Sequence, residues 1–265
     1  MKFFNFYSSV VFCLALCLCG CEQENTETRL KTKFEYVDES FDVNSWKTEN
    51  QKFDRINIGG TKINIPPPRG FVNGTETFLG EALVSILGMP TYIDYLQYFK
   101  PKDIAAILDD DFAEKWENDY TFFNVRTLRE VEYHDAKPND LNDAKETSHG
   151  GTTSGDKLRK QYLEKYRDGV SRNLKDLEII DSENDFGISD IKTLPIHDES
   201  KYHYSWVTYT RSHIAGDVDI EIGIMTIILI KNRLFYLIAV SNNTDSKENL
   251  KSIMYDWSRS TISAN

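Results

Sequence analysis

The chain has 265 residues, with 31 Lys and Arg against 42 Asp and Glu and a formal net charge of −11. Hydrophobic residues make up 40% of it and aromatic residues 12%, which is enough for one well-packed domain. Binding of nucleic acid depends on Lys and Arg that neutralise phosphates, and no basic cluster offsets the acidic balance. Nucleic acid is therefore excluded from the expected partners.

The first 21 residues combine a secretory signal with a motif for lipid attachment. Lys2 is followed by a mostly apolar stretch whose core is about 10 residues long, whereas a membrane span needs about 20. Leu18-Cys19-Gly20-Cys21 resembles the lipobox of bacterial lipoproteins. The resemblance implies cleavage before Cys21, diacylglycerol on its thiol and acylation of its new amino group. The alternative is an ordinary signal cleaved near Gly20, with Cys21 left as a free thiol.

Cysteine usage favours lipid attachment. All four cysteines lie at or before residue 21, so removal of the signal leaves only Cys21, with no disulfide and no cysteine metal site beyond it. Glu22 follows the cysteine. In enterobacterial sorting an aspartate at this place retains lipoproteins at the inner membrane, so the resemblance favours the outer membrane. We expect a lipid-anchored protein of the cell envelope that faces the periplasm.

Residues 22–51 are polar and charged and are predicted to form a tether, although aromatic residues at 34–46 could pin its later part onto the domain. Residues 52–265 are predicted to form a single domain. The domain starts with the pattern of a β-hairpin, in which isoleucines alternate on both sides of Gly59-Gly60 and Pro66 ends the second strand.

The middle of the chain has the following predicted elements. These are a helix over 78–87, a short helical piece over 92–99, a buried strand over 102–111, a strand over 120–133, an exposed loop over 135–155 and an amphipathic helix over 156–177.

The last third is the most β-like part of the chain. Strands are predicted over 187–197, 202–214, 217–230 and 233–242, with Lys231-Asn232 as a hairpin turn between the last two. A final helix follows. Its predicted core face holds Leu250, Ile253 and Trp257, and its predicted water-facing side holds Lys247, Lys251 and Arg259.

This order of elements predicts an α+β domain with a mostly antiparallel sheet and helices packed over it. The segments "INIPPPRGF" and "FYLIAVSNNTDSKENLKSIMYDWSRSTISAN" resemble a set of uncharacterised bacterial envelope proteins, which end with "W…AN" on a terminal helix. That resemblance implies the fold and supplies no chemistry. The arrangement is more distantly similar to the antiparallel sheet between helices of PsbP and Mog1 proteins.

Two groups of residues are candidates for a site. Asp217, Asp219 and Glu221 alternate along one predicted strand, and three carboxylates in a row can hold Ca²⁺, although plain alternation with apolar neighbours explains them as well. Five histidines form no spaced metal motif, so no metal or cofactor is expected beyond this weak candidate.

Aromatic residues form the second group. Tyr202, Tyr204 and Trp206 share parity along a predicted strand. If that face is open, it could bind a peptide, a glycan or a partner protein; if a helix covers it, the residues belong to the core. Taken together, the sequence favours a lipid-anchored, non-catalytic binding or accessory domain of unknown ligand, whose partner could be an envelope protein or a glycan. The alternative is an envelope enzyme, such as a metal-assisted hydrolase that uses Asp217 to Glu221.

Overall fold

The computed structural model describes residues 53–87, 92–105, 120–149, 164, 167–168, 171–172, 175, 182, 186–214 and 217–265. The predicted signal with Cys21 and the tether lie outside the described residues, as does most of the helix predicted over 156–177. Within the described part, no helix is both long enough and apolar enough to cross a membrane.

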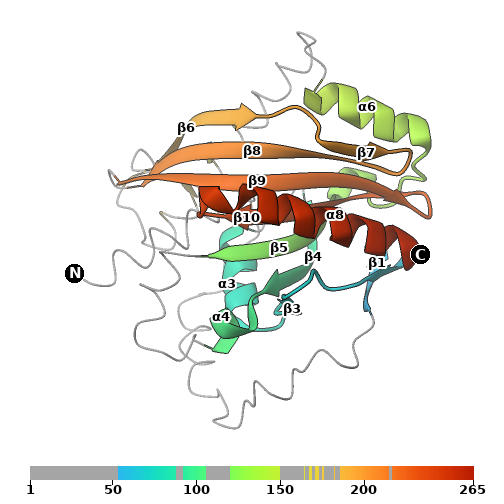
Figure 1. Ribbon diagram of the computed structural model, residues 1–265, viewed down its shortest axis with the longest axis horizontal. Coiled ribbons are helices and arrows are strands. Elements are labelled where there is room, and N and C mark those ends of the chain that lie inside the picture. The colour runs from blue at the N-terminus through green and yellow to red at the C-terminus, as the bar shows by residue number, and fades with distance from the viewer. Residues whose placement is uncertain are drawn as a thin grey trace.

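Antiparallel strands form two sheets (Figure 1). β1 pairs with β2 in a two-stranded sheet, and the main sheet has the order β3-β4-β5-β10-β9-β8-β6, with β7 also paired to β8. The strands are β1 (Asp54–Ile58), β2 (Thr61–Ile65), β3 (Val72–Asn73), β4 (Tyr92–Phe99), β5 (Thr121–Leu128), β6 (Phe186–Thr193), β7 (Asp198–Ser200), β8 (His203–Ile214), β9 (Asp217–Ile230) and β10 (Arg233–Ser241).

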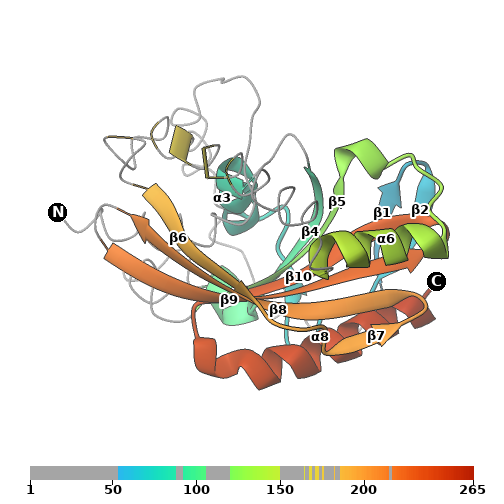
Figure 2. The same ribbon diagram turned by 90° about the horizontal axis from the view of Figure 1, so that it is seen from above.

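Helices lie on both faces of the curved main sheet. Figure 2 shows α8 along one face, and α3 and α6 on the opposite face. The helices are α3 (Phe78–Leu87), α4 (Pro101–Ala105), α6 (Pro138–His149) and α8 (Lys247–Ser263), with 3-10 turns η3 (Arg129–Val131) and η5 (Thr244–Ser246). The predicted fold class, a single α+β domain with a mostly antiparallel sheet, is confirmed.

The main core lies between α8 and the sheet. Trp257 is 1% exposed, and its ring makes edge contacts with Tyr98 at 5.7 Å and Phe123 at 5.5 Å between centroids. Its Nε1 donates a hydrogen bond to the Pro66 carbonyl oxygen at 2.6 Å. The predicted apolar stripe of the last helix is therefore confirmed, and it also holds the end of β2.

Three predictions for the middle of the chain were wrong. Residues 92–99 form strand β4 and not a helix. The sequence looked helical because a β-bulge between Asp94 and Leu96 breaks the alternation of side chains along the strand and gives the apolar residues a helix-like spacing. At the start of the strand predicted over 102–111, residues 101–105 form the short helix α4, with Pro101 at its first position, and residues 106–111 lie outside the described part of the chain. Residues 138–149, within the predicted loop, form helix α6, whose Leu141 is buried.

Candidate functional site

The hairpin β1–β2 is defined by its turn. Gly59 and Gly60 have φ values of +51° and +84°, as the two central residues of a type I′ turn require. At Gly59 a Cβ would overlap the Glu132 carbonyl oxygen, so glycine is needed there for space as well. Arg233 reaches from β10 and donates to the Ile58 and Gly59 carbonyl oxygens, both at 3.1 Å, which fixes the hairpin to the main sheet.

The turn determines which backbone groups each strand presents to its outer edge. In a two-residue hairpin the pair next to the turn, Ile58 and Thr61, exchanges hydrogen bonds, and this pattern alternates along the ladder. Ile56 and Ile58 therefore face β2, whereas the N–H and C=O groups of Arg55 and Asn57 point away from it.

The outer edge of β2 is closed by the C-terminus. Asn64 N–H donates to Asn265 Oδ1 at 2.9 Å, and Asn265 Nδ2 donates to the Asn64 carbonyl oxygen at 2.7 Å. Lys231 Nζ donates to the Lys62 carbonyl oxygen at 3.1 Å. The side-chain amide of Asn265 thus takes the place that a third strand would occupy.

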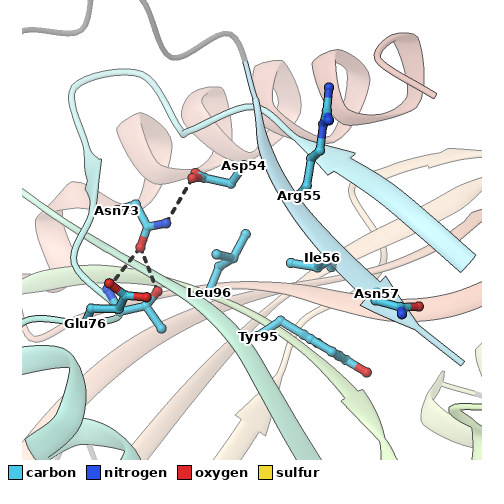
Figure 3. A pocket seen from close by; sticks show the side chains of 9 residues that line it. Asp54, Arg55, Ile56, Asn57, Asn73, Glu76, Tyr95 and Leu96 are labelled. Atoms are coloured by element: carbon cyan, nitrogen blue, oxygen red, sulfur yellow. Dashed lines mark hydrogen bonds between the residues drawn. The ribbon is translucent and has the colours of Figure 1, made fainter. Parts of the chain in front are cut away.

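The outer edge of β1 lines a cavity of about 650 Å³. Four successive residues of β1 contribute to it, together with the end of β3, the segment that follows it and the middle of β4. Its lining residues are Asp54, Arg55, Ile56, Asn57, Asn73, Thr75, Glu76, Tyr95 and Leu96 (Figure 3). Because side chains of both parities line it, the backbone edge of β1 forms one wall. Among the described residues, β1 has only β2 as a strand neighbour.

One end of this cavity is acidic and held in place by hydrogen bonds. Asp54 accepts from Asn73 Nδ2 at 2.9 Å and from the Tyr98 hydroxyl at 2.8 Å. Asn73 Oδ1 in turn accepts from the Thr75 N–H and hydroxyl, at 3.0 and 2.7 Å. Burial and the neighbouring Asp54 carboxylate raise the pKa of Tyr98, so it stays a donor. Exposed Glu76 adds a second carboxylate beside this network (Figure 3).

Tyr95 forms the wall from β4. Its hydroxyl donates to Glu132 Oε1 at 3.1 Å, which holds the half-buried ring in one orientation. Burial and the Glu132 carboxylate raise its pKa, so this phenol also remains protonated. Figure 3 shows the Tyr95 side chain extending below β1 on the side of Asn57, whereas Arg55 points away from the acidic network. The cavity is therefore a groove with one acidic end and one aromatic wall.

The predicted carboxylate stripe does not form a described metal centre. Glu221 is fully buried and accepts a hydrogen bond from the Tyr120 hydroxyl. Asp219 accepts from the Ile220 N–H at 2.7 Å, and burial raises its pKa against that hydrogen bond. The side chain of Asp217 lies outside the description, and no three metal-ligating side chains in the described ranges are grouped for a metal. Binding of Ca²⁺ by this stripe stays a prediction.

The apolar neighbours of this stripe are not uniformly in the core. Val218 and Ile220 are 56% and 45% exposed, whereas Ile222 is fully buried. Plain alternation therefore does not hold along this strand, because Val218 and Ile220 are exposed and from Glu221 onward residues on both faces are buried.

The predicted aromatic group is divided. Tyr204 and Trp206 are buried and stacked, with ring centroids 5.3 Å apart, in a small core with Leu141 of α6. A helix covers this face, as the core alternative expected. Tyr202 lies in the turn before β8 and is 41% exposed, with Lys201 Nζ 4.7 Å from its ring centroid.

A serine, a histidine and an aspartate that the sequence analysis missed lie together at the β7–β8 turn. Ser200 Oγ is 2.8 Å from His203 Nδ1, and His203 Nε2 is 2.9 Å from Asp198 Oδ2. Since a carboxylate only accepts, Nε2 carries the proton, and in a neutral ring Nδ1 accepts from the Ser200 hydroxyl. The sequence signal was a Ser-x-x-His turn with an aspartate five residues before the histidine.

Asp198 also joins this turn to α8. Arg259 contacts both carboxylate oxygens, at 2.9 and 3.0 Å, so it is not simply directed to water as predicted. Burial raises the pKa of Asp198, but the hydrogen bonds from Arg259 and His203 outweigh burial and lower that pKa to about 2.

Neither known protein families nor curated proteins match this chain. Among solved structures it is similar to the Ran-binding protein Mog1p of Saccharomyces cerevisiae, with 11% identity and a TM-score of 0.32 over 78% of this chain and 93% of that one. A mutant of protein Mog1 shows 10% identity and a TM-score of 0.29 over 81% and 89%. Mog1 is one of the two folds that the sequence suggested.

Proposed function

We propose that this chain is a lipid-anchored lipoprotein of the bacterial cell envelope whose domain binds a partner in the β1 groove without catalysing a reaction. The observation that carries the proposal is the groove itself. It combines an open strand edge, an oriented carboxylate at Asp54 and a fixed aromatic ring at Tyr95. Such a mixture of apolar wall and few oriented polar groups is typical of binding sites.

The anchor rests on the signal and lipobox at residues 1–21. A lipid on Cys21 would confine the domain to a membrane surface that faces the periplasm, with the outer membrane favoured. The residues between Cys21 and β1 would then set how far the groove reaches from that surface. Cys21→Ser should accumulate as an unprocessed precursor and should not incorporate labelled palmitate in cells. Incorporation that persists in this variant would refute the anchor.

Binding in the groove can be tested with a matched pair of photocrosslinking residues. Asn57 and Lys62 are directly opposite in the hairpin register and both are exposed, but they lie on different strands. With p-benzoylphenylalanine at one position or the other, irradiation of the native envelope should give a discrete adduct from position 57 and none from position 62. Equal adducts, or an adduct from position 62 alone, would contradict a partner in the groove.

An envelope hydrolase is the second candidate, and one observation favours it. The exposed hydroxyl of Ser200 could attack an ester carbonyl carbon while its proton passes to His203 Nδ1. Loss of the alcohol, which takes that proton, would leave an acyl-serine that water hydrolyses by the same route. This candidate ranks second because Arg259 already neutralises Asp198, which weakens its support for a positively charged imidazole.

The two candidates differ in a single labelling experiment. A fluorophosphonate probe should label the chain only if Ser200 is nucleophilic. Labelling that is lost in Ser200→Ala and in His203→Asn would establish the hydrolase and displace the non-catalytic proposal. Absence of labelling in the parent chain would remove the second candidate.

A further inference from the structure

We propose that the partner enters the groove as an extended peptide segment, which adds to the outer edge of β1 as a third strand and places a Lys or Arg side chain at the acidic end. This inference rests on the proposed binding function and specifies its ligand. The occupant is a segment of another protein, recognised through its backbone and one basic side chain.

The register of the hairpin determines which backbone groups of β1 point away from β2. Arg55 and Asn57 direct both N–H and C=O away from β2, and both residues line the cavity. Within the described part of the chain, no backbone hydrogen bond to these two residues is formed outside the β1–β2 ladder. Arg55 and Asn57 together present two N–H and two C=O groups, spaced as on the edge of a β-sheet. An added strand pairs with groups in this arrangement.

A free edge of this kind is unusual in a native protein, because it invites association with other chains. The domain closes the neighbouring edge of the same hairpin with Asn265 and Lys231. It also covers the end of β4 with the short strand β3, which pairs at Tyr98 and Phe99. The edge of β1 lacks such a cover among the described residues and lines the cavity instead.

Charge selects the side chain. Asp54 and Glu76 line the groove, and no described ion pair neutralises either of them. Arg55 also lines it but extends away from this end (Figure 3). A peptide side chain over Asp54 and Glu76 should therefore be cationic, whereas a side chain nearer Asn57 can lie against the Tyr95 ring.

The test uses amide hydrogen exchange by NMR on residues 22–265, with a blocked hexapeptide of alternating Lys and Val as the probe. Addition of the peptide should slow exchange at Arg55 and Asn57. Exchange at Ile56 and Ile58, whose N–H groups already face β2, should not change. Equal slowing of exchange at all four residues, or no slowing at any of them, would overturn the proposal.

Two controls separate backbone from charge. The same peptide with N-methyl groups on its two adjacent central amides cannot pair along either edge, and it should bind about tenfold or more weakly. Glu76→Gln should weaken the unmodified peptide by a few-fold and reduce the salt dependence of its binding. Binding that is indifferent to N-methylation would contradict strand addition.

The outcomes also separate this inference from the proposed function. A photocrosslinked adduct at position 57 without alternating protection by the peptide would keep a binding groove and reject strand addition. Loss of both results would reject both. Protection of Arg55 and Asn57 that rises with protein concentration in the absence of peptide would show that a second copy of this chain occupies the edge, which also overturns the proposal.

Discussion

The two strands of the hairpin β1–β2 have the same length, but their outer edges have opposite surroundings. On β2, the backbone of Asn64 is satisfied by the side-chain amide of Asn265. On β1, the equivalent groups of Arg55 and Asn57 face a cavity. The hairpin is therefore asymmetric, since Asn265 closes the β2 edge and nothing in the described part of the chain closes the β1 edge.

Two segments at opposite ends of the domain meet at the closed edge of the hairpin. The segment that contains Asn64 and Pro66 and the segment that ends in Asn265 together carry the resemblance to the envelope proteins, although they lie about 200 residues apart in the sequence. In the structure they meet, through Asn265 at Asn64 and through Trp257 Nε1 at the Pro66 carbonyl. Helix α8 thus packs into the core, and Trp257 and the residue Asn265 after the helix also hold β2 in place.

The largest expected effect comes from Trp257, which supports the closed edge. Trp257→Ala removes a buried indole and its hydrogen bond to Pro66, and it should lower the free energy of unfolding by about 3–5 kcal/mol. Thermal unfolding of residues 22–265 measures this change. Tyr255→Ala, which truncates an exposed ring on the same helix, is the control. Equal midpoints for the Trp257→Ala variant and the parent would place the indole outside the core.

The turn between the two edges offers a matched pair of glycines. Gly59→Ala combines a positive φ with an overlap on the Glu132 backbone and should cost about 3 kcal/mol. Gly60→Ala has a positive φ but no atom within 4 Å of the new Cβ, and should cost about 1–2 kcal/mol. Denaturant unfolding of both variants gives the order. A Gly60→Ala variant less stable than the Gly59→Ala variant would contradict the close contact with Glu132.

Asn265 closes the β2 edge directly. Asn265→Ala removes its hydrogen bonds to Asn64 and should cost about 1–2 kcal/mol, because the strand groups become exposed to water rather than buried without partners. Exchange of the Asn64 amide should become faster, while that of Arg55 should not change. Ser263→Ala, at the exposed last position of α8, is the control. Unchanged exchange at Asn64 would show that its protection has another source.

The smallest effect concerns Arg259 and depends on pH. Arg259→Ala should cost about 1 kcal/mol, since its guanidinium is partly exposed. A carboxyl with a lowered pKa stabilises the fold above its unfolded pKa and loses that contribution as pH falls through its folded pKa. The difference between variant and parent should therefore be complete above about pH 4 and shrink toward pH 2. A difference that does not vary between pH 6 and pH 2 would exclude Asp198 as the relevant partner.

Local patterns predicted much of the fold. The hairpin followed from two glycines between alternating isoleucines, and the Lys231-Asn232 turn was also correct, with φ values of +49° and +61°. The apolar stripe of α8 was confirmed at Leu250, Ile253 and Trp257. Each of these elements is specified by residues within a short window of the sequence, so hydrophobic periodicity and turn propensity are enough to predict it.

The groove and the helix that covers the aromatic face could not be predicted in this way. The groove combines β1, the segment after β3 and the bulged part of β4, and the bulge made that strand resemble a helix. The cover over Tyr204 and Trp206 is α6, which was hidden in a segment rich in turn residues. Both depend on contacts between distant segments, which composition and spacing do not encode.

Amide hydrogen exchange of residues 22–265 without any ligand tests the contrast between the two edges most directly. We expect slow exchange at Ile56, Ile58 and Asn64, whose N–H groups are bonded within the hairpin or to Asn265, and fast exchange at Arg55 and Asn57. Protection of Arg55 and Asn57 as strong as that of Asn64, at all protein concentrations, would show that the β1 edge is already occupied by the chain itself. That result would contradict an open edge and the binding groove built on it.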